Sequence, residues 1–299
     1  AEEEAQIIQW KQDNKLDELF RFLFIKQCNA LNEILPGLFE KTTDYTEVLL
    51  NLSVVDQEGV VYKLTHDIPE KDFNIEQVYK KGVLMVDHGE IQEFPSPEIE
   101  PYLVERAHKT FHVAALTAED FAEKRPRGII GMVDGEITTV DAGYSDRIDV
   151  EYDVLKIAVV ERHKNTHHIG IGFLQGYGLK SGAVATSVSH DSHNIIVVGA
   201  DEASMAAAVN RVVELNGGIV VWDGGGVAAE VPLAIAGIMS DEPLTVVNIQ
   251  LEAAKSKAHA LGVNPNIDPF MTLSFMALPV IPSLRITTRG VFDVTTQSY

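Results

Sequence analysis

The first forty residues carry apolar side chains at steps of three and four positions, the spacing that puts them on one face of a helix. The members of this stripe are Leu16, Leu19, Phe20, Leu23, Phe24, Cys28, Leu31 and Leu35. Pro36 and Gly37 end the pattern, since neither residue favours a continued helix. Two β-rich runs follow, Val48–Val55 and Val60–Leu64, separated by residues of turn composition. We therefore predict a helix-and-hairpin region over residues 1–67.

The pattern changes in residues 68–111, which favour a strand followed by a linker. The apolar run Val83–Val86 leads into Asp87-His88-Gly89-Glu90, which is typical of a strand that ends in a tight turn. Pro95-Ser96-Pro97 gives the strongest linker signal, because prolines interrupt regular elements. We expect a β-rich segment and linker here, and a larger domain over residues 112–299.

Strand and helix patterns alternate in this larger domain. Ile195–Val198 is a short apolar run, and Asp201 is placed to cap the helix that follows it. That helix ends near Leu215, and Ile219–Trp222 is the next strand pattern. A second helix is predicted over Val246–Leu261. The order is that of a βαβ unit, so we predict a layered α+β or α/β fold for the C-terminal domain.

A polar run interrupts the apolar strands of this domain. Ser189-His190-Asp191-Ser192-His193-Asn194 stands between Ala183-Val184-Ala185 and Ile195–Val198. Buried polar groups cost free energy unless they are paired, so a strand core has no need of this sequence. We predict that His190, Asp191, His193 and Asn194 cluster at a strand end, partly accessible to solvent, beside a cavity or a protein interface.

Several motifs of this domain resemble the C-terminal domain of bacterial and archaeal adenine deaminases. The similarity covers about residues 112–295. Its main motifs are Glu161-Arg162-His163, Gly176-Tyr177-Gly178-Leu179-Lys180, Ser189-His190-Asp191-Ser192-His193-Asn194, Asp268-Pro269-Phe270-Met271 and Arg289-Gly290-Val291-Phe292-Asp293-Val294. The resemblance implies the conversion of adenine and water to hypoxanthine and ammonia, within purine metabolism.

The resemblance also implies a part that this chain lacks. Complete family enzymes belong to the amidohydrolase superfamily and hold a divalent metal, such as Mn, Fe or Zn, in a (β/α)8 barrel. Such a barrel takes about 250 residues and a His-x-His pair, which is absent from this sequence. We expect no catalytic barrel, no cofactor held by this chain and no deaminase activity unaided. The alternative is a non-catalytic purine-binding or assembly module that docks onto a separate barrel or forms homo-oligomers.

The candidates for lining a purine site are His190, Asp191, His193, Asn194, Lys180 and His163. Imidazole and amide groups can hydrogen-bond the ring nitrogens and the amino group of adenine. Metal ligation by His190 and His193 is a weaker alternative, because the two side chains point apart on a strand and converge only in a turn. The third alternative is that these residues only order a polar loop.

Other polar groups have simpler interpretations. His167 and His168 fit a solvated loop, and His108 with His112 would form a metal pair only on a continuous helix. Gly224-Gly225-Gly226 precedes a strand pattern, which favours a hairpin turn over a phosphate loop.

Charge and composition narrow the possible partners. The 44 acidic and 24 basic residues give a net charge of −20, which repels nucleic-acid phosphates and anionic lipid but not a neutral purine. No apolar run reaches the roughly 20 residues of a membrane span, and the acidic N-terminus does not resemble a signal peptide. We expect a cytoplasmic protein without nucleic-acid or membrane partners.

Overall fold

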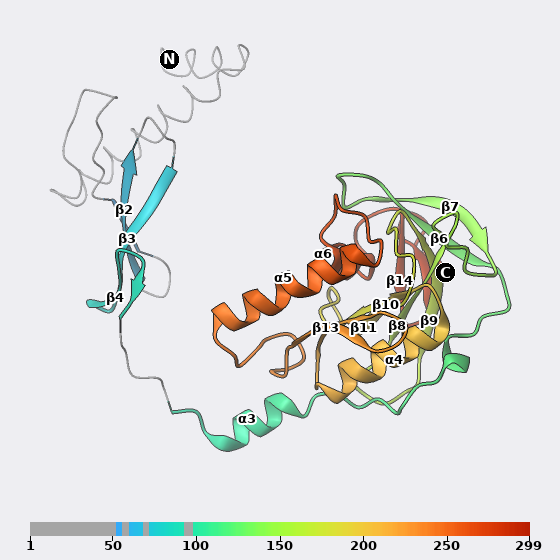
Figure 1. The fold of residues 1–299 in the computed structure, drawn as a ribbon, viewed down its shortest axis with the longest axis horizontal. Helices are drawn as coiled ribbons and strands as arrows, with labels where there is room; N and C mark the ends of the chain where they lie inside the picture. The colour runs from blue at the N-terminus through green and yellow to red at the C-terminus, as the bar shows by residue number, and fades with distance from the viewer. Residues whose placement is uncertain (1–51, 56–59, 68–71, 93–97) are drawn as a thin grey trace, which may run out of the picture. The chain divides into compact units, whose positions relative to one another are not determined.

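The computed structural model describes residues 52–55, 60–67, 72–92 and 98–299 (Figure 1). The chain divides into two compact units, residues 1–98 and 99–299, which we describe separately. The predicted helix over residues 1–40 and the linker Pro95-Ser96-Pro97 lie outside the described residues. The expected division at residues 67/68 and 111/112 stays a prediction.

The N-terminal unit contains a five-stranded antiparallel sheet. Its strands are β1 (Leu52–Val55), β2 (Val60–Asp67), β3 (Asp72–Lys80), β4 (Val83–Asp87) and β5 (Glu90–Ile91), and they pair in the order of the sequence. The predicted hairpin is confirmed, because β1 pairs with β2. Lys81 and Gly82 both have positive φ angles, +50° and +79°, which suits the two-residue turn between β3 and β4.

The C-terminal unit is built on an eight-stranded sheet with the order β13-β12-β10-β11-β8-β9-β6-β7. Helix α3 (Pro101–His108) and the 3-10 helix η1 (Ala118–Phe121) precede this sheet. The strands are β6 (Arg127–Met132), β7 (Thr139–Ser145), β8 (Leu155–Val160), β9 (Ile169–Gln175), β10 (Ala183–Thr186), β11 (Ile195–Gly199), β12 (Gly218–Trp222) and β13 (Val227–Pro232). Only β6 and β9 pair in parallel.

The predicted βαβ unit is present in a split form. Strand β11, helix α4 (Glu202–Glu214) and strand β12 follow one another, but β10 lies between the two strands and is antiparallel to both. The strands β11 and β12 therefore run in the same direction. The predicted cap is also confirmed, because the Asp201 carboxylate accepts the Ser204 N–H at 2.7 Å.

Helices cover both faces of this sheet (Figure 1). Successive residues of β8 point to opposite faces, and each face has its own core. Val159 packs in the core that includes residues of α5 (Leu244–Ala260) and α6 (Pro269–Met276). Val160 packs in the other core, which includes residues of α4 and Phe121 of η1. The domain thus has three layers, which confirms the predicted layered fold of α+β or α/β type.

The local signals for the later elements are also confirmed. Helix α5 matches the helix predicted over Val246–Leu261, and Gly262 follows its end with φ +104°. Asp268 caps α6 and accepts two backbone N–H groups, with Pro269 in the first turn. Two short strands, β14 (Leu284–Thr287) and β15 (Gly290–Asp293), complete the chain. In the part of the chain described, no helix has the length and apolar character needed to cross a membrane.

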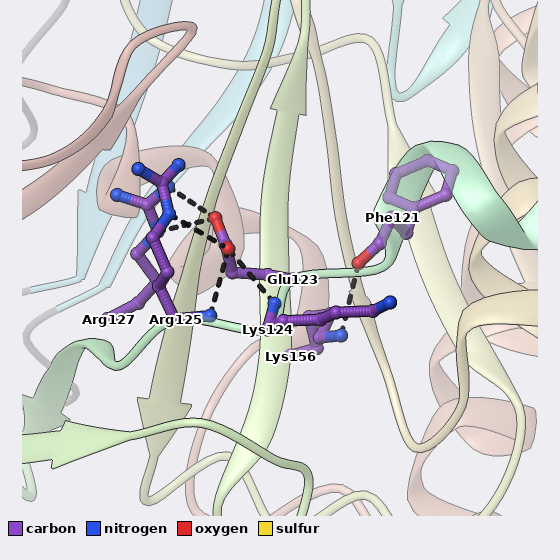
Figure 2. A network of polar contacts seen from close by, with 6 residues as sticks. All are labelled: Phe121, Glu123, Lys124, Arg125, Arg127 and Lys156. Atoms are coloured by element: carbon purple, nitrogen blue, oxygen red, sulfur yellow. Dashed lines mark hydrogen bonds and ion pairs between the residues drawn. The ribbon is translucent and has the colours of Figure 1, made fainter.

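A polar network fixes the segment between η1 and β6 (Figure 2). The Glu123 carboxylate accepts hydrogen bonds from the Arg127 guanidinium and from the backbone N–H of Lys124 and Arg125, the last two at 3.0 Å. Burial alone would raise the pKa of Glu123, but these donors lower it to about 2. The Lys156 ammonium, on β8, donates to the Phe121 carbonyl at 3.0 Å and so ties η1 to the sheet.

Candidate functional site

Strand pairing brings two polar loops to the same end of the eight-stranded sheet. Val160, the last residue of β8, pairs with Ile195, the first residue of β11, and with Ile169, the first residue of β9. The connection between β8 and β9 (residues 161–168, the His163 loop) therefore lies beside the connection between β10 and β11 (residues 187–194, the His190 loop). The predicted site residues at this end of the sheet are His163 in the first loop and His190, Asp191, His193 and Asn194 in the second.

The His190 loop closes on itself as a turn. The His193 N–H donates to the Ser189 carbonyl at 2.6 Å, and the Ser189 N–H donates to Nδ1 of the His193 ring at 3.3 Å. His193 has a φ of +47°, in the left-handed region that a turn of this kind requires. The His190 N–H donates to the Ser274 carbonyl of α6 at 3.2 Å, which anchors the turn on that helix.

The turn brings the rings of His190 and His193 together. Their centroids are 5.9 Å apart, and the His190 ring also packs against Phe275 of α6 at 5.1 Å. All three side chains are partly exposed, and Asp191 is exposed. Asn194 is buried: its side-chain oxygen accepts the Arg162 N–H at 3.2 Å, and its amide donates to Ser192 Oγ at 3.0 Å. Asn194 therefore orders the loop, while the two rings remain partly exposed.

The surroundings of His193 favour its neutral imidazole form. Burial lowers the pKa of His193 most, and the nearby His190 and Arg162 lower it further. Its Nδ1 accepts the Ser189 N–H, so the neutral ring carries its proton on Nε2. Among the described residues, no hydrogen bond engages His193 Nε2. His193 thus offers a hydrogen-bond donor to a ligand at this end of the sheet.

His163 contacts this turn and also lines a depression in the surface. Its Nε2 contacts the Ser192 carbonyl at 2.8 Å. An open depression of about 540 Å³ is lined by Phe111, His112, Val113, Ala114, His163, Lys164 and Asn165. The other members of the predicted cluster do not line this depression, so their place beside a cavity or interface stays a prediction.

Lys180 is not near the predicted cluster. It precedes β10, whereas His190 follows β10, so the two residues lie at opposite ends of the strand. The Lys180 N–H donates to the Leu261 carbonyl at 2.8 Å, and its ammonium donates to the Val150 carbonyl at 3.3 Å. Lys180 therefore belongs to the turns at the other end of the sheet.

Arg162 connects the two loops, and the sequence patterns did not single it out as a site residue. The side chain is 3% exposed. Its guanidinium donates to the His193 carbonyl, to the Ala236 carbonyl at 3.0 Å, and to the carbonyl and hydroxyl of Thr110 at 3.4 and 3.3 Å. It also stacks on the Phe111 ring at 4.3 Å. The available signal was an arginine two residues after the apolar run 157–160 that ends β8.

Metal ligation by His190 and His193 would need further ligands, and the described residues do not provide them. Within residues 52–55, 60–67, 72–92 and 98–299, no three His, Cys, Asp or Glu side chains form a group that could hold a metal ion. His167 contacts Asp120 at 2.9 Å in the His163 loop. Helix α3 ends at His108, so His108 and His112 do not share a helix. The described side chains therefore do not form a three-ligand metal site.

Comparison with known proteins identifies the class of this domain. Residues 134–298 match the model of a protein family described as the adenine deaminase C-terminal domain. The chain belongs to this family, which confirms the family predicted from the motifs.

The relatives are named adenine deaminases. One from Desulfatibacillum aliphaticivorans is 44% identical over 234 residues, which cover 75% of this chain and 40% of the relative. One from Nitratidesulfovibrio vulgaris (strain Hildenborough) is 52% identical over 147 residues, 49% of this chain and 26% of the relative. One from Bacillus subtilis is 50% identical over 146 residues, 49% of this chain and 25% of the relative. The chain thus spans at most about two fifths of the length of these relatives.

Proposed function

We propose that this chain supplies the C-terminal part of an adenine deaminase, which converts adenine and water to hypoxanthine and ammonia. Family membership and relatives that are named adenine deaminases support this assignment. The chain's own contribution is the His190 loop, which lines the purine site of the complete enzyme. The observation that carries this role is His193, whose Nδ1 is bound within the turn while the described residues leave Nε2 without a hydrogen bond.

The geometry of the loop suits a purine. Adenine presents ring nitrogens that accept hydrogen bonds, and the Nε2–H of a neutral His193 is a donor. The rings of His190 and Phe275 are tilted by 40° against each other, and each is partly exposed, so one of them can offer its face to a stacked purine. Asp191 is exposed at the tip of the turn and can accept a hydrogen bond from the amino group of adenine.

The metal that activates water for deamination has no place among the residues described. We therefore assign no metal-dependent step to this chain. In the proposed enzyme the metal and the reacting water belong to a catalytic barrel outside this sequence, on the same or on a separate polypeptide. This chain alone, mixed with adenine and Mn²⁺, Fe²⁺ or Zn²⁺, is expected to release no ammonia. Robust turnover would contradict this part of the proposal.

Purine binding is testable without turnover. Calorimetry with adenine should show binding by the wild-type chain and at least a tenfold loss in His193→Ala, the size of one lost hydrogen bond in a desolvated site. His259→Gln is the matched control, because His259 also has one ring nitrogen bound to the backbone, in its case to the Val263 carbonyl at 3.2 Å. Equal affinity in wild type and His193→Ala would reject the role of the loop.

The second candidate function is a non-catalytic assembly module, and helix α3 favours it. No side chain of α3 is buried, and Ile99, Tyr102, Leu103 and Val104 are exposed at or beside it. Apolar side chains gathered on a helix are typical of surfaces that pack against another protein. Sedimentation of the wild-type chain and of Leu103→Glu tests this function. A dimer that dissociates in the variant supports homo-oligomers, and a monomer in both contradicts them.

A further inference from the structure

Arg162 is buried without the partner that a buried arginine usually has. It is 3% exposed, and within the described residues its guanidinium donates to carbonyl groups and to the Thr110 hydroxyl. Burial lowers the pKa of Arg162 to about 10, so the group stays charged at neutral pH. An unpaired buried charge is costly, and this cost must be offset by the contacts that the guanidinium makes.

Those contacts reach segments that are distant in the sequence. The guanidinium donates to carbonyl groups of His193, Thr110 and Ala236, which are 31, 52 and 74 residues away from Arg162. The planar fork of an arginine suits several acceptors at fixed angles, which a lysine ammonium cannot reproduce. The Phe111 ring, stacked at 4.3 Å, supports one face of the fork.

One of these acceptors belongs to the site. Arg162 binds the backbone carbonyl of His193, and the side-chain Nδ1 of the same residue is bound by the Ser189 N–H within the turn. On its other side, the Arg162 N–H donates to Asn194. The side chain and the backbone of Arg162 therefore both hold the end of the His190 loop, at the two residues that precede β11.

We propose that Arg162 is the positioning residue of the purine site: it fixes the His193 ring in one tautomer and one orientation from inside the domain. That the ligand is a purine rests on the proposed function. The contacts by which Arg162 holds the His193 turn do not depend on it. Arg162 itself does not contact the purine. The charged and titratable groups around the His193 ring are His190, Arg162, Asp191 and His163.

The test follows the His193 imidazole by NMR in the full chain, through its ring nitrogen signals and their titration. The wild type should show a single Nε2–H tautomer and a pKa below 6.5. Arg162→Gln should give a mixture of tautomers, an upward shift of the His193 pKa and about a tenfold weaker adenine binding. Arg162→Lys keeps the charge but loses the fork, so the tautomers should mix while the pKa moves less.

Arg285 provides the matched control. It is fully buried, its pKa is also lowered to about 10 by burial, and it donates to the Ile137 and Pro282 carbonyls. Its Nη1 also lies 3.9 Å from Sδ of Met276 on α6, but none of its hydrogen bonds among the described residues is to the His190 loop. Arg285→Gln should change stability without changing the His193 signals. Unchanged His193 signals in Arg162→Gln, or equal changes in Arg285→Gln, would overturn the proposal.

A milder variant decides the question if the arginine variants do not fold. Thr110→Val retains Arg162 but removes its hydroxyl acceptor at 3.3 Å. A smaller shift of the His193 signals in the same direction supports the proposal, and no shift overturns it. If the wild type does not bind adenine while the His193 signals respond as expected, the proposed function fails and the positioning role stands.

Discussion

Tyr177→Phe tests how the connection before β10 is fixed to α6. Tyr177 is fully buried, and its hydroxyl donates to the Pro269 carbonyl at 3.1 Å. The net value of such a hydrogen bond is about 1 kcal/mol. The Pro269 carbonyl lies in the first turn of α6, where helix geometry also pairs it with the backbone N–H of the residue four positions later. This carbonyl therefore keeps a hydrogen-bond partner in the variant. We expect a loss of about 1 kcal/mol, or roughly 2–4 °C in Tm, measured by urea and thermal unfolding at pH 7.

The pH dependence gives a second readout of the same group. Burial raises the pKa of Tyr177, and the negative charge of Asp268 raises it further. The folded state therefore resists ionisation of Tyr177, while the unfolded chain ionises near pH 10. The stabilisation is complete below about pH 10 and is lost as the pH rises further. Wild type should lose stability more steeply than Tyr177→Phe between about pH 9 and 11. Equal slopes, or an unchanged stability at pH 7, would refute this reasoning.

Three further predictions concern stability. Asp201→Ala removes the cap of α4 and should cost about 1 kcal/mol in urea unfolding, which Asp201→Asn should largely restore. Gly170→Ala should prevent normal packing, because its Cβ would lie 1.8 Å from the Thr287 carbonyl oxygen; Gly226→Ala, with no atom within 4 Å, is the control, and equal melting temperatures would contradict the prediction. In an acid titration, wild type should lose stability between about pH 4.5 and 2 as Glu123 becomes protonated, and Glu123→Gln should lose less over that range.

Elements whose causes are local in the sequence were predictable. Asp201 and the pair Asp268-Pro269 mark helix starts because a cap acts within three residues. The apolar run Ile195–Val198 predicts a buried strand without reference to its neighbours. The family was also readable, because its motifs are ordered along the chain.

The arrangement in space was not predictable from the same patterns. Periodicity says which residues of a strand are buried, but it does not say that β10 enters between β11 and β12. The separation of Lys180 from His190 had a visible signal, since a strand pattern lies between them. For Arg162 the sequence signal was only its position after an apolar run, and this could not show its role, because its partners come from segments up to 74 residues away.

The position of β10 has a consequence for the way the domain assembles. The hairpin of β10 and β11 needs only its own loop to close, and α4 then returns the chain to add β12 at the free edge of β10. The centre of the sheet is thus made from about forty consecutive residues, so its pairings close short stretches of chain. The His190 loop is the turn of the β10–β11 hairpin. The residues proposed to meet the ligand therefore also lie in the turn that sets the register of this central pairing.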